Sequence, residues 1–322
     1  MIVAGIDEAG YGPTLGPLVV SLSAFRVASP NPTGSMWQVL RRAVCRKPDG
    51  RRIPVDDSKK LFSQKKGLRN LEEGLLPFVQ LQCEGVPPSL RDLLGKLAVS
   101  KTPPYLDDYP WYRDRNVELP RATFRTAVEA RTQRLVETLA TTDVEFVGLA
   151  ARPFEVAEFN AAIEHRENKA EVSFTAISDF LRGLWKRFPN EPVDVVIDRQ
   201  GGRRYYGPLL FKAVKPRGLK VERQTPSQSI YGLRRPHESE PTFRVHFSKE
   251  GDARSLPVAL ASMLSKYVRE LHMGVFNQFW KEHMAELRPT AGYAVDANRF
   301  LKDIRPLLGR LEIDNRFLVR AR

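Results

Sequence analysis

Residues 1–20 are MIVAGIDEAGYGPTLGPLVV, an apolar run that leads directly into two adjacent carboxylates and then into a segment rich in glycine and proline. The β-forming residues at the start predict a strand, and Gly10 and Gly12 predict that it ends after Asp7 and Glu8. Paired acids at a strand end, beside glycines that let a partner approach the backbone, indicate a site for a divalent metal or a phosphate. A turn in which both carboxylates face water is the simpler alternative.

Two further acids occupy comparable positions. Residues 193–198, VDVVID, form a β-branched run that ends in Asp198, and Asp252 opens a long helical pattern. Carboxylates are ligands that Mg²⁺ and Mn²⁺ prefer, and neighbouring acids repel one another unless a cation lies between them. Each acid also has a simpler alternative role, Asp198 as a turn residue and Asp252 as the N-cap of its helix.

Four segments stand out along the chain: GIDEAGYGPTLGPLVV at 5–20, DDSKKL at 56–61, VVID at 195–198 and EGDARSLPVALASMLSKYVREL at 250–271, followed by a Gly292-Tyr293 pair. In this order they resemble the motifs of the ribonuclease HII family (type 2 ribonuclease H). This chain departs from the family at Tyr11, where the family usually has arginine. The two flanking glycines are kept, but the loop lacks a guanidinium that could bind a phosphate.

The resemblance implies a ribonuclease H-like α/β fold and a metal-dependent endoribonuclease that cleaves the RNA strand of RNA–DNA hybrids. It implies that four acids are both the catalytic residues and the ligands of Mg²⁺ or Mn²⁺: Asp7, Glu8, Asp198 and Asp252. Two such cations would activate water and stabilise the leaving oxygen of a phosphodiester. Substrate contacts are implied for Gly10, Tyr11, Gly12, Ser58, Lys59, Lys60 and Tyr293.

Several alternatives remain open at this stage. A solvated helix start also explains the lysines near Lys59, and an amphipathic ring packed against the protein also explains Tyr293. A nuclease of the same fold with a changed substrate, such as a DNA structure, is a second functional hypothesis. A protein that binds hybrids without cleaving them is a third.

The composition favours a nucleic-acid partner. The chain has 51 Lys+Arg against 38 Asp+Glu, a formal net charge of +13, and this excess attracts a phosphate backbone. Two cysteines without a CxxC spacing, the absence of a secretory pattern and the lack of an apolar run of about 20 residues predict a cytoplasmic protein with no membrane association. The sequence does not identify any protein partner, and the C-terminal NRFLVRAR is interpreted as a solvated end.

The alternation of strand and helix patterns predicts an α/β fold, with a central mixed sheet flanked by helices and a helical C-terminal part. We expect one catalytic domain over residues 1–322, with insertions near 28–55, 101–120 and 225–241. The aromatic 101–120 segment is predicted to cover the substrate, to bind a partner or, as we favour, to pack against the protein. Strands are expected near 1–7, 17–26, 78–84, 144–149, 193–198, 219–224 and 242–247, and helices near 61–76, 121–141, 169–188, 204–214, 253–284 and 296–309.

Overall fold

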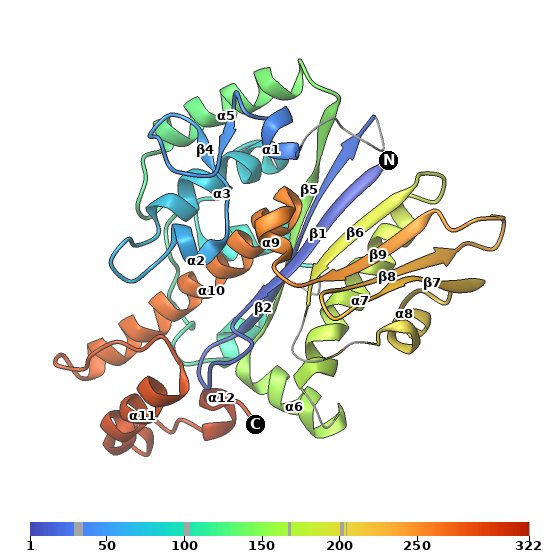
Figure 1. Cartoon of the computed structure of the whole chain (residues 1–322). Helices are drawn as coiled ribbons and strands as arrows, with labels where there is room; N and C mark the ends of the chain where they lie inside the picture. The colour runs from blue at the N-terminus through green and yellow to red at the C-terminus, as the bar shows by residue number, and fades with distance from the viewer. Residues whose placement is uncertain (29–34, 100–103, 167–168, 200–202, 204, 322) are drawn as a thin grey trace.

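A computed structural model describes residues 1–28, 35–99, 104–166, 169–199, 203 and 205–321 (Figure 1). Its main feature in this part of the chain is a seven-stranded sheet in the order β5-β2-β1-β6-β9-β8-β7. The strands are β1 (Ile2–Ala9), β2 (Leu18–Val27), β5 (Val144–Phe154), β6 (Val193–Asp198), β7 (Gly218–Gln224), β8 (Gln228–Arg234) and β9 (Phe243–Ser248). A separate short parallel pair is formed by β3 (Val44–Cys45) and β4 (Ile53–Pro54).

The directions of the central strands decide where the acid-bearing segments meet. β1 runs antiparallel to β2 and parallel to β6, and β6 runs parallel to β9. In register, Ile6 pairs with Ile197, and Asp198 pairs with Ser248. The carboxyl ends of β1, β6 and β9 therefore lie at the same edge of the sheet, although they come from three distant parts of the sequence.

Helices cover both faces of this sheet. Figure 1 shows α10 on one side and α7 on the other, with α11 and α12 near the C-terminus. The helices are α1 (Met36–Val39), α2 (Ser58–Leu61), α3 (Arg69–Cys83), α4 (Leu90–Leu97), η1 (Pro104–Asp108, a 3₁₀ turn), α5 (Arg125–Leu139), α6 (Val156–Arg166), α7 (Lys169–Arg187), α8 (Gly207–Val214), α9 (Gly251–Arg254), α10 (Leu256–His283), α11 (Ala294–Leu308) and α12 (Asn315–Leu318). The expected fold class, a mixed sheet flanked by helices with a helical C-terminal part, is confirmed.

Each face of the sheet carries its own hydrophobic core. The first core joins β2 residues such as Val19 and Phe25 to Leu260 and Leu264 of α10. The second core joins Ile6 of β1 to helices α7 and α8. Because successive side chains of a strand point to opposite faces, β1 contributes its even-numbered residues to the second core and turns its odd-numbered residues toward α10.

Gly5 explains how closely α10 approaches the sheet. A Cβ atom at this position would lie 2.2 Å from both the carbonyl carbon of Pro257 and the backbone nitrogen of Val258. Ser23 on β2 donates a hydrogen bond to the Pro257 carbonyl oxygen at 2.7 Å. The start of α10 therefore lies directly on β1 and β2, which brings the preceding α9 to the strand ends.

Most of the expected elements are confirmed, the helix expected at 61–76 begins only at Arg69, and one element is wrong. Residues 78–83 belong to helix α3 and Glu84 is its C-cap, so no strand forms at 78–84. Phe78 and Val79 favour a strand locally, but they continue the buried face that Leu71 and Leu75 begin, and the helix passes through Pro77. Helices α4 and α6 were not among the expected elements.

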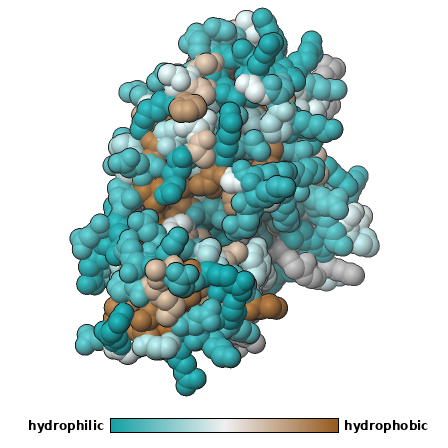
Figure 2. Space-filling view, turned by 90° about the vertical axis from the view of Figure 1, so that its left-hand side faces the viewer, coloured by the Kyte–Doolittle hydropathy of each residue, from teal (hydrophilic) through white to brown (hydrophobic). Residues whose placement is uncertain are grey.

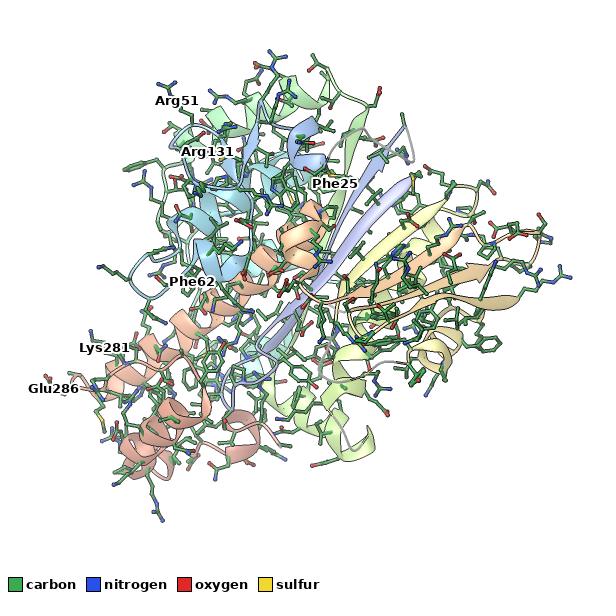
Figure 3. The ribbon with its side chains drawn as sticks, in the orientation of Figure 1. Phe25, Arg51, Phe62, Arg131, Lys281 and Glu286 are labelled. Atoms are coloured by element: carbon green, nitrogen blue, oxygen red, sulfur yellow. The ribbon has the colours of Figure 1, made fainter. Side chains whose placement is uncertain are left out.

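The expected insertions have structure of their own. Residues 29–34 and 101–103 lie outside the described part of the chain; the rest of 28–55 contains α1, β3 and β4. Arg131 of α5, which is labelled in Figure 3, donates to Glu73 of α3 at 2.9 Å and to the carbonyl of Gly50 at 3.0 Å, and this ties the β3–β4 connection to the helices. The segment 225–241 contains β8. That the chain forms one catalytic domain stays a prediction.

The aromatic segment after η1 packs against the protein, as favoured. Tyr109, Trp111 and Tyr112 are each 2–3% exposed, so these three rings are not available to cover a substrate. The side chain of Tyr105 lies outside the described part of the chain. Figure 2 shows that the face on the left of Figure 1 is mostly hydrophilic, with exposed hydrophobic atoms confined to limited areas. Among the described helices, none is both long enough and apolar enough to cross a membrane.

Candidate functional site

Acidic side chains gather at the edge where β1, β6 and β9 end. Asp7 lies near the end of β1, and Asp198 is the last residue of the neighbouring parallel strand β6. Asp252 lies in α9, which follows β9 after two residues. The backbone nitrogen of Gly251 donates to Asp198 Oδ1 at 2.9 Å, and this hydrogen bond joins the third and fourth motifs directly. Asp252 is inside α9, whose N-cap is Glu250, so the alternative role of Asp252 as an N-cap is wrong.

The electrostatics of these acids reflect burial and mutual repulsion. Burial, together with the charges of Glu8 and Asp198, raises the pKa of Asp7 well above its ordinary value. Burial also raises the pKa of Asp198, and burial with the charges of Asp57 and Asp198 raises the pKa of Asp252. Carboxylates held this way are stabilised in their charged form by a nearby cation. The donor set, all carboxylate oxygen, fits a hard divalent ion such as Mg²⁺ or Mn²⁺.

Glu8 has a different orientation from Asp7. It follows Asp7 on β1 and therefore shares the strand face of Ile6, while Asp7 shares the face of Gly5, which α10 covers. The charge of Glu8 contributes, after burial, to raising the pKa of Tyr11.

Within the described part of the chain, no three His, Cys, Asp or Glu side chains are grouped as a metal site. Metal binding by the four acids is therefore part of the proposal below.

The second motif lies beside the acids. The hydroxyl oxygens of Ser262 of α10 and Ser58 lie 3.1 Å apart, and a hydrogen bond from Ser262 lowers the pKa of the Asp7 carboxyl against the larger effect of burial, which links α2 to the end of β1. The charge of Lys59 lowers the pKa values of Asp198 and Asp252, although burial outweighs it. Lys60 forms an ion pair with Asp56 at 3.3 Å. Of the two predicted phosphate contacts, Lys59 is thus the one whose charge acts on Asp198 and Asp252.

Sequence reasoning missed one acid in this same motif. Asp57 caps the N-terminus of α2, where its side chain accepts from the backbone nitrogen of Lys59 at 2.9 Å. Its charge also raises the pKa values of both Asp198 and Asp252. Its position directly before Ser58 in the DDSKKL segment was the available signal, but a capping Asp is common and does not by itself indicate proximity to other acids.

The loop between β1 and β2, residues 10–17, is called the glycine loop. Its backbone is closely packed at Gly10 and open at Gly12. Gly10 has a φ of +88°, and a Cβ there would lie 2.6 Å from the carbonyl oxygen of Pro17. Gly12 is exposed, and a Cβ there would meet no atom within 4 Å. Tyr11 between them is half-buried against the second core. The loop therefore presents open backbone at Gly12 while its start is fixed.

Tyr293 lies across the loop. The backbone nitrogens of Thr14 and Leu15 donate to the carbonyl oxygen of Gly292 at 2.8 and 3.2 Å, so the residue before Tyr293 is tied to the loop. The Tyr293 ring is 53% exposed, and the guanidinium of Arg269 lies 5.9 Å from its centroid. The alternative of a fully packed ring does not hold, and the exposed ring is available to contact a sugar or base.

A buried polar network that sequence reasoning missed lies behind this loop. Glu155 accepts a hydrogen bond from the Tyr112 hydroxyl at 3.2 Å, and its other oxygen lies 3.3 Å from His272 Nε2. His272 Nδ1 lies 2.7 Å from the Val268 carbonyl oxygen and must carry the hydrogen there, which leaves a lone pair on Nε2. Burial raises the pKa of Glu155 to about 8 and lowers that of His272 to about 4. A protonated Glu155 facing a neutral His272 satisfies both groups.

Glu155→Gln is expected to change how the stability of the protein depends on pH. Because the folded-state pKa of Glu155 is about 8, against an ordinary value of 4.5, the folded protein binds this proton more tightly than the unfolded chain. The resulting stabilisation is complete below about pH 4.5 and is lost as the pH rises toward 8. In urea denaturation, the free energy of unfolding of the wild type minus that of the variant should therefore fall across this range. A difference that rises with pH would contradict the assignment.

No family model and no curated protein sequence matches the chain. The chain is similar to the ribonuclease HII of Archaeoglobus fulgidus solved with PCNA, with 17% identity and a TM-score of 0.47, covering 100% of this chain and 95% of that one. It is also similar to ribonuclease H2 of Pyrococcus horikoshii OT3, with 14% identity and a TM-score of 0.41, covering 99% and 92%.

A third similar structure is Bst-RNase HIII in complex with Mn²⁺, with 14% identity and a TM-score of 0.42, covering 99% of this chain and 66% of that one. The chain is thus similar to three type 2 ribonuclease H structures over nearly its whole length, at low sequence identity. Because the identities are low and all three TM-scores lie below 0.5, the activity has to be argued from the site.

Proposed function

We propose that this protein is a metal-dependent endoribonuclease that cleaves the RNA strand of RNA–DNA hybrids. The observation that carries the proposal is the set of acids from three distant segments at one sheet edge, where Asp7, Asp198 and Asp252 are partly or fully buried and have raised pKa values. Buried carboxylates of like charge are unfavourable for stability, so their arrangement is better explained by function. We further propose that residues 1–322 act as one catalytic domain in the cytoplasm.

The four acids Asp7, Glu8, Asp198 and Asp252 would hold Mg²⁺ or Mn²⁺, which when bound supply Lewis-acid stabilisation of the phosphate and activation of water. The chain's own groups act around them. Lys59, beside the acids, would contact a phosphate oxygen of the substrate strand. The hydrogen bond from Gly251 fixes the rotamer of Asp198, and Ser262 orients the carboxyl of Asp7.

Substrate would reach this edge across the glycine loop. The open backbone at Gly12 and the exposed ring of Tyr293 lie on either side of the Thr14–Gly292 hydrogen bond. Backbone groups at Gly10 to Gly12 can bond to a ribose hydroxyl, and an aromatic ring can stack on a sugar or base. The formal net charge of +13 adds general attraction to nucleic acid, which weakens with salt.

A digest of matched substrates tests the proposal. The purified chain is incubated with an RNA–DNA hybrid, duplex DNA, duplex RNA, and duplex DNA containing one ribonucleotide, each with Mg²⁺, Mn²⁺ or EDTA. We expect cleavage of the RNA strand of the hybrid with either metal, with 5′-phosphate and 3′-hydroxyl ends, and no cleavage in EDTA because the acids alone cannot stabilise the phosphate charge.

The other outcomes of this digest separate the alternatives. Cleavage of duplex DNA at a rate equal to that of the hybrid would favour a nuclease with a changed substrate. Binding of the hybrid without cleavage in any metal would favour a non-catalytic binding protein. The duplex with a single ribonucleotide tests whether recognition tolerates Tyr11, because Tyr11 lacks the guanidinium of the arginine usual at this position in the ribonuclease HII family.

A further inference from the structure

The end of the chain packs against the glycine loop at its beginning. Arg320 is 3% exposed, and its Nη1 donates to the Gly10 carbonyl oxygen at 2.6 Å. Its Nη2 donates to the Pro17 carbonyl oxygen at 3.4 Å, and its backbone nitrogen donates to the Thr14 carbonyl oxygen at 2.9 Å. The interpretation of the C-terminal segment as a solvated end is therefore wrong, because one arginine of this segment contacts both ends of the loop.

The C-terminal segment is itself anchored to α6. Asn160 Nδ2 donates to the Val319 carbonyl oxygen at 2.8 Å, and Asn160 Oδ1 accepts from the backbone nitrogen of Ala321 at 2.7 Å. These two bonds flank Arg320 on both sides. Arg320 is thus held in place by an element that is separate from the loop it contacts.

A second buried arginine holds the loop from the side of α10. Arg269 Nη2 donates to the carbonyl oxygens of Leu15 at 3.3 Å and Ala291 at 3.0 Å. Its Nε lies 2.7 Å from the position that a Cβ of Gly10 would occupy. Together the two arginines bond the carbonyls of Gly10, Leu15 and Pro17, while Gly12 stays open.

Stability alone does not account for this arrangement. Both guanidinium groups are almost fully buried, and the charge of Arg269 contributes to lowering the pKa of Arg320, after burial as the main cause. In each of them Nε has no hydrogen-bond partner among the described residues. Glu270 lies 3.6 Å from Arg269 Nη1 and only partly offsets these charges. Burying two like charges with incomplete hydrogen bonding is unfavourable, so the role of the pair is better explained by the geometry that it determines. Here the geometry they determine is that of the loop.

We propose that Arg320 is a positioning residue for nucleic-acid recognition, which holds the Gly10–Gly12 backbone in the conformation that contacts the ribose-phosphate strand. The inference rests on the proposed function and extends it to the C-terminal segment. A loop ordered before binding does not lose conformational entropy when substrate arrives, so its anchor contributes to affinity without touching the substrate.

The test compares Arg320→Ala with Arg316→Ala. Arg316 is in the same segment and is exposed, and its guanidinium pairs with Asp314 and lies over the ring of Phe317, so it controls for loss of one positive charge near the C-terminus. Affinity for a fluorescent RNA–DNA hybrid is measured in EDTA by anisotropy, and KM and kcat are measured with Mg²⁺. For Arg320→Ala we expect Kd and KM to rise about ten-fold or more and kcat to change by less than about three-fold. Arg316→Ala should stay within about two-fold in all three.

Two further measurements separate positioning from general damage. Added guanidinium should lower the KM of Arg320→Ala and leave that of Arg316→Ala unchanged, because only the first variant has a site for it. Arg320→Lys, which keeps the charge and loses the two-pronged donor, should still show a raised KM with a melting temperature near that of the wild type. If Arg320→Ala does not fold, the lysine variant carries the test.

The failures are distinguishable. Wild-type Kd and KM in a folded Arg320→Lys or Arg320→Ala variant would overturn the positioning role and leave the nuclease proposal intact. A fall in kcat and melting temperature with unchanged KM, and without guanidinium rescue, would also overturn it. Wild-type protein that neither binds nor cleaves the hybrid would instead overturn the proposed function.

Discussion

Asp7→Asn is expected to reduce hybrid cleavage by about 10³-fold or more while leaving the protein folded. The variant removes the most buried acid of the site, so a cation would lose a charged ligand at the end of β1. Its amide keeps nearly the same volume, so the packing against α10 is preserved. Initial rates on the hybrid with saturating Mg²⁺, together with circular dichroism, measure both parts of the expectation.

Without metal, the Asp7→Asn variant is expected to be at least as stable as the wild type. Burial and two neighbouring acids raise the pKa of Asp7 well above its ordinary value, so ionised Asp7 destabilises the metal-free protein at neutral pH. Asn at this position should therefore give an equal or higher melting temperature in EDTA. Asp194→Asn is the matched control. Asp194 is a half-buried acid on β6 that pairs with Val3, near the start of β1 and not at the carboxyl ends of the strands, so its replacement should leave activity unchanged. Wild-type activity in Asp7→Asn would reject the assigned site.

Gly5→Ala is expected to have the largest effect on folding, a loss of about 3 kcal/mol or more in the free energy of unfolding. The added methyl group would lie 2.2 Å from backbone atoms of Pro257 and Val258, and backbone atoms cannot rotate away. Either α10 moves off β1 or the chain fails to fold. Because α9 and α10 carry Asp252 and Ser262, displacement of α10 should also abolish cleavage. Urea denaturation and the hybrid digest measure the two effects.

Gly183→Ala is the control for this substitution. Gly183 lies within α7 and is exposed, and a Cβ atom there would meet no other atom within 4 Å. The same change should there stabilise the protein by about 0.5–1 kcal/mol, because alanine has the higher helix propensity. Equal effects of the two substitutions would contradict the close approach of α10 to the sheet.

Local sequence patterns were sufficient for most of the central elements. The β-branched run 193–198 and the apolar start of the chain became β6 and β1, because strand preference and glycine breakers act within a few residues. The long helix α10 followed from its apolar repeat, and its buried residues include Leu256, Leu260 and Leu264. The wrong strand at 78–84 shows the limit, since the buried face of α3 overrode the local preference of Phe78 and Val79.

The candidate site was only partly accessible to the same reasoning. Each acid stood at a recognisable strand or helix end, so Asp7, Asp198 and Asp252 could be singled out before any contact was known. Asp57 could not be distinguished from an ordinary helix cap, because its effect on the other acids depends on a distance in space and not in sequence. The buried pair Glu155–His272 carries no motif at all and becomes visible only when β5 and α10 pack together.

The sequence by itself determined the strand-forming start, the acids at the ends of the elements and the positive charge of the chain, since these depend on residue type and short spacing. Only the tertiary structure decided that Arg320 contacts Gly10, that Gly5 lies against Pro257, and that the aromatic segment near Trp111 is buried. Such contacts join residues hundreds of positions apart. They form because parallel strands bring distant carboxyl ends to one edge and because α10 lies close to the sheet. Neither condition can be predicted from a local sequence pattern.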